Sequence, residues 1–255
     1  MPLKNMEISR WENGSFSRLS DLVIEERRVD ICLNGPVYAS VMAEAAQLDC
    51  LALGFLFGEG VIEGPGDIKS LEVDGLQVRV EIFGPAPPPP ERARSSGFGL
   101  GSVAVGMESR LKDSGRRPRP FKLSAAKIIS LMHEFNCRSE LFQKSGAVHS
   151  TALIAGSRRY FAEDVGRHNA LDKVVGAYLA DSFPQGEPAL ILTSGRVSTE
   201  IMLKTARAGL GGLISRSAPT DRAVEMAREL DLLLIGFARG ERFNIYHGAD
   251  NRVIV

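Results

Sequence analysis

The sequence predicts an α/β protein whose larger, C-terminal part is one sheet with helices on both faces. Two observations carry this prediction. Beyond residue 148, short apolar runs alternate with amphipathic stretches of about ten residues, the pattern of strands followed by helices. Before residue 90, strand patterns instead flank tight-turn pairs around one short apolar helix. We therefore expect a smaller α+β part over residues 1–90 and an α/β domain over residues 123–255.

The N-terminal part is predicted from turn chemistry and apolar spacing. Asn34-Gly35 and Asp74-Gly75 are tight-turn pairs, because these residues tolerate positive φ. Apolar residues at mostly even spacing before and after each pair indicate strands. The predicted elements are strands over Asp21–Leu33 and Val37–Val41, a helix over Cys50–Phe57 capped by Asp49, and a hairpin over residues 71–82.

A proline run, Pro87–Pro90, ends this part, because proline cannot donate to a strand ladder. Residues 91–122 are expected to form a mobile loop rich in glycine and arginine. The segment carries eight basic residues against three acidic ones. It is either a solubilising loop or a grip for an anionic ligand or partner.

The C-terminal part repeats strand and helix patterns, which favours a mostly parallel sheet covered on both faces. Ser124 is a candidate N-cap for its first helix. The predicted helices cover Ala125–Phe142, Asn169–Ala180, Thr199–Ala208 and residues 219–230. The predicted strands cover Val148–Ala155, Arg159–Ala162, Ala189–Thr193, Leu213–Ser215, Leu232–Phe237 and Phe243–Tyr246.

Composition narrows the function classes. The 255 residues carry a formal net charge of zero, so nothing points to a nucleic acid or a membrane surface as partner. The N-terminus lacks the apolar core of a signal peptide, and the run Cys50–Phe57 is too short to span a bilayer. We expect a cytoplasmic protein.

The three cysteines, Cys32, Cys50 and Cys137, are widely separated. None forms a CxxC pair, and no two of them lie at zinc-ligand spacing together with a histidine, so no metal site is predicted. Small buried thiols are the expectation for all three.

Polar and basic side chains cluster where strands are predicted to end. In α/β sheets the ligand crevice lies outside the carboxyl ends of the strands, where helix starts also expose N–H groups. Arginine at such a point suits phosphate, which favours a phosphorylated, nucleotide-like ligand. The alternative is arginines spread over solvated loops. The four segments are Glu163–Asn169, Thr193–Glu200, Ser215–Thr220 and Phe237–Arg242.

The stretch Glu163–Lys173 resembles the central motif of the FdhD family, formate dehydrogenase accessory sulfurtransferases. The resemblance runs in order from about Val29 to Tyr246, over nearly the whole chain. Its companion motifs are Leu53–Gly60, Phe142–His149, Thr193–Ser198 and Gly236–Tyr246.

The resemblance implies a cytidine-deaminase-like mixed sheet and a cytoplasmic homodimer. It also implies that the protein takes persulfide sulfur from a cysteine desulfurase. The sulfur would then pass to the molybdenum bis(molybdopterin guanine dinucleotide) cofactor before formate dehydrogenase receives it. The family's cofactor-binding segment falls on Phe237–Arg242. With the strand-end residues, the candidate cofactor-binding set is Phe237, Ala238, Arg239, Gly240, Glu241, Arg242, Asp164, Gly166, Arg167, His168, Asn169, Ser194, Gly195, Arg196 and His149.

The chain departs from the family where the sulfur is carried. The family places a CxxC in the loop after the N-terminal part, and Gly97 and Leu100 stand at those positions here. Neither side chain can form a persulfide, so we assign no catalytic residue. Cys137, on a predicted helix, is expected to be a poor replacement.

Three hypotheses follow. The first is an FdhD-like protein that binds the cofactor, with sulfur transfer lost or dependent on another protein. The second is a sulfurtransferase that uses Cys137 or another thiol. The third is a non-catalytic chaperone or adaptor that docks a molybdoenzyme through the basic segment. Within the central motif, we expect His168 and Asp172 to brace each other on one helix face.

Overall fold

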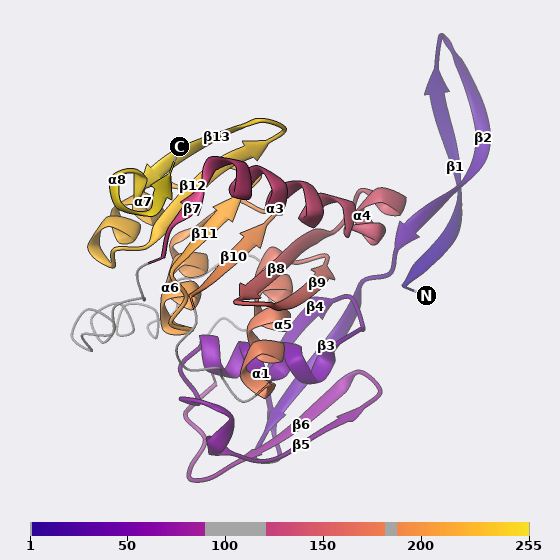
Figure 1. Ribbon diagram of the computed structural model, residues 1–255. Helices are drawn as coiled ribbons and strands as arrows, with labels where there is room; N and C mark the ends of the chain where they lie inside the picture. Colours follow the sequence, from indigo (N-terminus) through magenta and orange to yellow (C-terminus); the bar gives the residue numbers. More distant parts are fainter. Residues whose placement is uncertain (1, 90–120, 182–187, 255) are drawn as a thin grey trace.

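The computed structural model describes residues 2–89, 121–181 and 188–254 (Figure 1). Its N-terminal part holds a two-stranded sheet, β1-β2, and a four-stranded sheet in the order β4-β3-β6-β5. The elements are β1 (Leu3–Glu12), β2 (Ser15–Ile24), β3 (Arg27–Leu33), β4 (Val37–Ala43), α1 (Leu48–Gly58), a 3-10 turn (Pro65–Asp67), β5 (Ile68–Asp74) and β6 (Gln77–Ile82).

The C-terminal part is a six-stranded mixed sheet in the order β13-β12-β11-β10-β8-β9. A short parallel pair, β7 with β14, lies apart from it. The elements are β7 (Leu123–Ser124), α3 (Ala125–Cys137), α4 (Glu140–Ser145), β8 (His149–Ala155), β9 (Arg158–Asp164), α5 (Arg167–Ala180), β10 (Ala189–Thr193), α6 (Thr199–Arg207), β11 (Gly212–Ser215), α7 (Asp221–Glu229), β12 (Leu233–Arg239), β13 (Arg242–His247), α8 (Ala249–Arg252) and β14 (Val253–Ile254).

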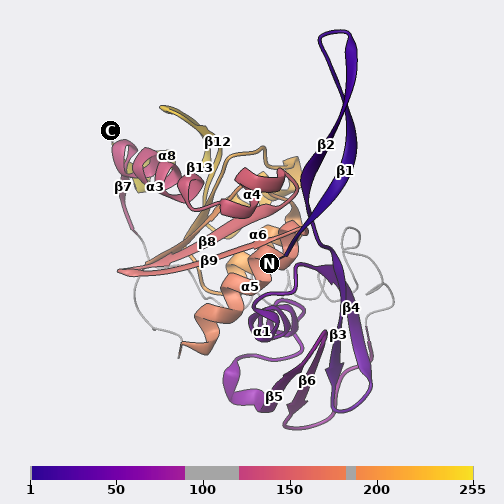
Figure 2. The same cartoon turned by 90° about the vertical axis from the view of Figure 1, so that its right-hand side faces the viewer.

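Helices cover both faces of this sheet, as predicted. Alternate residues of β8 show the division, since Leu153 packs into the cluster with α5, α6 and α7, while Ile154 packs with α3. Figures 1 and 2 show α3 across one face and α5 on the other. The cluster on the α5 side continues into α1 and the four-stranded sheet, so both parts of the chain share one core.

Helices α1 and α5 lie side by side because two glycines let their backbones touch (Figure 2). A Cβ atom added at Gly54 would lie 2.6 Å from the carbonyl carbon of Asp172 and 2.9 Å from the nitrogen of Gly176. A Cβ at Gly176 would in turn lie 2.9 Å from the nitrogen of Gly54. Side chains at these positions would force the helices apart, so the small-residue contact fixes how closely α5 packs against α1.

Several predicted elements differ from the structure. The sheet is not mostly parallel: β10-β11 and β11-β12 are parallel pairs, whereas β8-β9, β8-β10 and β12-β13 are antiparallel. The single strand predicted over Asp21–Leu33 is wrong, because the chain turns after Ile24 and begins β3 at Arg27. Helix α1 begins after Gln47, not at a cap formed by Asp49.

The helix predicted over Ala125–Phe142 is two helices. Ser124 does cap the first, accepting a hydrogen bond from the Lys127 amide at 3.1 Å. The chain then breaks after Cys137, because the Glu163 carboxylate accepts the amides of Leu141 and Phe142 at 3.0 and 3.1 Å and so fixes a new helix start. The remaining strands and helices lie within a few residues of their predicted bounds. The loop predicted over residues 91–122 lies almost wholly outside the described residues.

Candidate functional site

The strand-end residues meet at one edge of the six-stranded sheet, as predicted. Strands β10, β11 and β12 run parallel and end there. Strand β8 runs antiparallel to β10, so its first residue, His149, lies at that same edge, paired in register with Asp164 at the end of β9. Helix α5 begins directly beyond it, and its first turn faces the edge.

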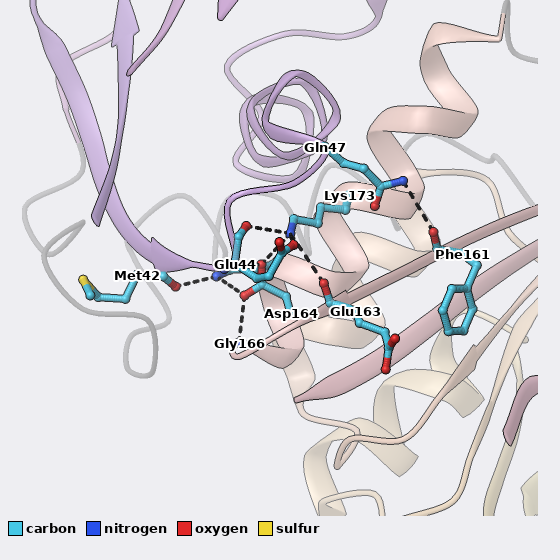
Figure 3. Close-up of polar contacts among 9 residues, drawn as sticks. Met42, Glu44, Gln47, Phe161, Glu163, Asp164, Gly166 and Lys173 are labelled. Carbon is cyan, nitrogen blue, oxygen red and sulfur yellow. Dashed lines mark hydrogen bonds and ion pairs between the residues drawn. The ribbon is translucent and has the colours of Figure 1, made fainter. Parts of the chain in front are cut away.

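Asp164 anchors the turn into α5. It is fully buried, and its Oδ1 accepts hydrogen bonds from the Gly166 amide and from Asn169 Nδ2, both at 2.9 Å. Its Oδ2 accepts the Glu44 amide at 3.1 Å and lies 2.8 Å from Lys173 Nζ. Both oxygens are therefore engaged within the protein, and the role that the geometry gives Asp164 is to hold the turn (Figure 3).

Asn169 extends this anchor to the N-terminal part. Its Nδ2 also donates to the Met42 carbonyl at 2.7 Å. A Cβ at Gly166 would lie 2.9 Å from that Nδ2, so glycine leaves the amide room to reach both acceptors. Asn169 and Gly166 shape the site through the backbone rather than by offering a free side chain.

A buried lysine completes the junction. Lys173 is fully buried, and its Nζ donates to the carbonyl of Glu44 at 2.9 Å and to Glu44 Oε2 at 3.1 Å. Figure 3 shows the ammonium group between Glu44 and Asp164. One cation thus compensates two buried carboxylates, an arrangement that is costly to break from one side. The sequence did not predict a role for Glu44, because nothing in the neighbouring sequence distinguishes it from a surface residue.

Three basic groups, His149, Arg167 and Arg196, lie near one another beside this anchor. Gly195 permits their approach, because a Cβ there would lie 3.0 Å from Arg167 Cβ and 3.5 Å from His149 Nδ1. Burial lowers the pKa of His149, and Arg167 and Arg196 lower it further against the opposing effect of Asp164. Burial also lowers the pKa of Arg167, as does Arg196, with Glu200 opposing them.

These shifts show that the positive charges of Arg167 and Arg196 act on each other and on His149. Neighbouring cations raise each other's electrostatic energy, and an anion placed between them would remove that cost. Arg167 Nε is buried without a hydrogen-bond partner among the described residues. A buried donor in that state is costly unless a bound acceptor reaches it. Arg196 is exposed.

The loop after β10 is held by its own hydrogen bonds. Ser194 Oγ accepts the Ser150 amide at 2.9 Å and lies 3.5 Å from His149 Nδ1. The Gly195 amide donates to Thr193 Oγ1 at 3.2 Å, and its carbonyl accepts Ser215 Oγ at 2.7 Å. Ser194 and Gly195 therefore lie in a loop whose conformation is fixed at this edge of the sheet.

His168 and Asp172 do not brace each other, contrary to prediction. Asp172 instead accepts two hydrogen bonds from the buried Lys204 of α6, at 2.9 and 2.8 Å. His168 Nε2 lies 3.3 Å from Glu200 Oε2. Burial, followed by Lys204 and Arg167, lowers the pKa of His168 to about 3, so the imidazole is neutral. The sequence did not predict a role for the buried Lys204, because it lies on an amphipathic helix.

The segment Phe237–Arg242 lies farther along the edge, at the β12-β13 turn. Phe237 has a φ of 51°, and its amide donates to the Ser217 carbonyl at 3.1 Å. Arg239 Nε donates to the Arg216 carbonyl at 2.8 Å, and the guanidinium of Arg216 lies 5.9 Å from the ring of Phe142.

The two groups of candidate residues are linked through the backbone. The Arg216 amide donates to the Thr193 carbonyl at 3.0 Å, directly before Ser194. Ala238 is buried in the core cluster that includes α3, so its side chain faces that core. The exposed members of the segment are Arg239, Gly240, Glu241 and Arg242.

A cavity of about 470 Å³ lies at strands β3 and β4 of the N-terminal sheet. The described residues that line it are Arg28, Ser40, Val41 and Met42. Met42 belongs to both regions, because its carbonyl accepts Asn169. The site thus borders the N-terminal sheet.

The thiols differ from the expectation that all three are buried. Cys32 is buried, Cys50 is half-buried and Cys137 is exposed. Cys137 is the last residue of α3, which ends earlier than predicted, and its Sγ lies 4.0 Å from His133 Nδ1. Burial, followed by Asp49, raises the pKa of Cys50 to about 11, which makes it a poor nucleophile.

Within the described ranges, no three His, Cys, Asp or Glu side chains gather as a metal ion would require. No helix in the same ranges is long and apolar enough to cross a membrane.

Comparisons with known proteins show the family of the chain. The chain is 32% identical to a sulfur carrier protein FdhD of Listeria innocua over 96% of this chain and 97% of that protein. It is 36% identical to the protein of the same name from Wolinella succinogenes, over 89% and 80% of the two chains. Bacillus subtilis FdhD is 32% identical over 94% of each chain.

A solved structure has the same fold. It is described as a formate dehydrogenase accessory protein from Desulfotalea psychrophila, and it covers 99% of this chain with a TM-score of 0.81 at 24% sequence identity. The FdhD/NarQ family model matches residues 24–254. The chain therefore belongs to the FdhD/NarQ family.

Proposed function

We propose that the protein binds the guanine dinucleotide of a molybdenum cofactor at the strand-end edge, as an accessory protein of formate dehydrogenase. The observation that supports this most is the group formed by Arg167, Arg196 and His149, with a buried guanidinium nitrogen that lacks a partner among the described residues. Phosphate oxygens would satisfy that donor and offset the mutual repulsion. When bound, the cofactor would supply the molybdenum centre, and the chain would position its nucleotide end.

Titration calorimetry with GDP tests this proposal. GDP should bind the wild type, and Arg167→Ala should weaken binding by at least tenfold, about 1.4 kcal/mol, because a charge-assisted hydrogen bond is lost. Arg79→Ala is the matched control, because Arg79 lies in the N-terminal sheet and pairs with Asp74. Absence of GDP binding to the wild type would contradict the proposal.

Sulfur transfer is a second candidate function, favoured by the exposure of Cys137 beside His133. With its proton accepted by His133, the Cys137 thiolate would attack the outer sulfur of a cysteine desulfurase persulfide. A new S–S bond forms on Cys137 as the old one breaks, and the desulfurase leaves as a thiolate with no net change in electrons.

Intact-mass measurement after incubation with a desulfurase and cysteine decides this candidate. A gain of one sulfur that persists in Cys32→Ser and disappears in Cys137→Ser would support it. An unchanged mass would leave cofactor binding as the protein's role, with sulfur supplied by another protein.

The remaining features of the proposal follow the family. They are a cytoplasmic homodimer, a cysteine desulfurase and formate dehydrogenase as partners, and kinship of the sheet with cytidine deaminases. The mixed sheet with helices on both faces supports that kinship. The basic segment of the adaptor hypothesis lies almost wholly outside the described residues.

A further inference from the structure

The hairpin formed by β1 and β2 stands away from the body of the protein. Its register runs from Leu3 opposite Ile24 to Glu12 opposite Ser15, and its turn is Asn13-Gly14, with φ angles of 50° and 85°. No other strand of the described residues pairs with it. Figures 1 and 2, which are perpendicular views, both show it projecting from the protein as an arm. We call residues 3–24 the arm.

The arm exposes large apolar side chains along its length. Trp11 and Phe16 are 60% and 75% exposed, and their rings lie in contact near the tip, 4.8 Å apart between centroids and tilted by 55°. Met6 is 52% exposed, and Leu22 and Val23 are each 37% exposed.

Both faces of the arm carry this apolar surface. Residues opposite each other in the register share a face. Trp11 and Phe16 therefore share a face with Leu22, whereas Met6 and Val23 lie on the other. A partner that covered one face would leave apolar side chains on the other in water, so the arm needs enclosure from both sides.

An arm of this kind needs a partner that is always present. An isolated two-stranded hairpin is at best marginally stable in water. The ion pairs of Glu25 with Lys4 at 2.6 Å and with Arg27 at 2.9 Å support only its root. A free apolar strand pair also invites aggregation. An enzyme bound only during maturation would leave the arm uncovered most of the time, whereas a second copy of the chain would not.

The charges of the arm fit a second copy. Its three basic residues balance three acidic ones, and the whole chain has a formal net charge of zero, so two copies approach without net repulsion. The basic residues are Lys4, Arg10 and Arg18, and the acidic residues are Glu7, Glu12 and Asp21. A strongly charged partner finds no complementary surface here.

The area of the arm is of the right order. A stable interface buries roughly 1,600 Å² in total, about 800 Å² from each partner. The exposed parts of Trp11 and Phe16 alone offer on the order of 300 Å² per arm, and a symmetric exchange buries both arms. The other exposed apolar side chains extend this surface toward the root.

We propose that the arm is a dimerisation element enclosed by a second copy of the chain, with the Trp11-Phe16 pair as its anchor. This names a surface for the homodimer of the proposed function. The root of β2 contacts α4, which carries Phe142 against Arg216, so the second copy would lie next to the strand-end edge.

Sedimentation and tryptophan fluorescence of the full chain test this proposal. Trp11 is the single tryptophan of the chain, so its emission reports on the arm alone. The wild type should sediment as a dimer, with blue-shifted emission and weak iodide quenching that both reverse on dilution. The double variant Trp11→Tyr with Phe16→Ser should raise the dimer dissociation constant at least a hundredfold at unchanged far-UV circular dichroism.

Phe83→Ser is the matched control, because Phe83 is 67% exposed and lies outside the arm, and it should remain dimeric. A monomeric wild type, or a double variant that dimerises as the wild type does, would overturn the proposal. Binding of a formate dehydrogenase to a monomeric wild type would assign the arm to that partner. GDP titration of the double variant separates the two proposals, since Arg167, Arg196 and His149 are unchanged in it.

Discussion

The contact between α1 and α5 predicts a large effect from one methyl group. In Gly54→Ala, the new Cβ would lie 2.6 Å from the carbonyl carbon of Asp172 and 2.9 Å from the nitrogen of Gly176. Real Cβ atoms essentially never come closer than 3.0 Å to such an atom. These atoms belong to the backbone, so no side-chain rotation relieves the overlap. The helices must separate, opening the core between them.

The magnitude follows from two opposing effects. Overpacking of a well-filled core costs about 1–3 kcal/mol and occasionally more, and overlap with rigid backbone places this case at the upper end. Alanine in a helix interior regains about 1 kcal/mol relative to glycine. We therefore expect the free energy of unfolding to fall by about 2 kcal/mol or more. Gly176→Ala should behave in the same way.

Urea denaturation followed by circular dichroism measures this change. Gly66→Ala serves as the control, because a Cβ there meets no atom within 4 Å, and its stability should change by no more than about 0.5 kcal/mol. A Gly54→Ala variant as stable as the wild type would refute the close contact between α1 and α5.

Three further predictions concern the site. His168 has a folded-state pKa of about 3 against an ordinary 6.5, so the unfolded chain binds more protons below pH 6.5, and stability should fall toward pH 3 by roughly 1.4 kcal/mol per unit. His168→Gln should remove this slope from urea titrations. The pKa of His149 is lowered in the free protein, and an anion near Arg167 would raise it, so GDP affinity should increase as the pH falls below 6.5. His149→Asn should flatten that dependence in calorimetry. Lys173→Met would leave Glu44 and Asp164 buried without their cation, and the free energy of unfolding should fall by about 3–5 kcal/mol in urea denaturation.

Turn chemistry and apolar periodicity predicted much of the fold. Asn34-Gly35 and Asp74-Gly75 correctly indicated hairpins, because short-range backbone preferences decide such turns. Asn13-Gly14 is a turn pair of the same kind. The arm was not predicted, because the apolar residues at the end of β2 were assigned to a single strand that continues into β3. The order and direction of strands depend on long-range packing, so the share of parallel pairs was overestimated.

The place of the site was predictable, but its internal contacts were not. Motif residues at strand ends identified the edge, because strand direction brings those ends together. The partners of Lys173 and Lys204 could not be predicted, since a buried lysine has the same local sequence as one on a solvated helix face. Asp172 was assigned to His168 from helical spacing, whereas its partner comes from another helix.

A crystal structure of the protein with GDP tests the central claim most directly. We predict the diphosphate within hydrogen-bond distance of Arg167, at the start of α5 and beside His149. Nucleotide bound elsewhere, for example in the cavity beside Met42, and without contact to Arg167, would contradict it.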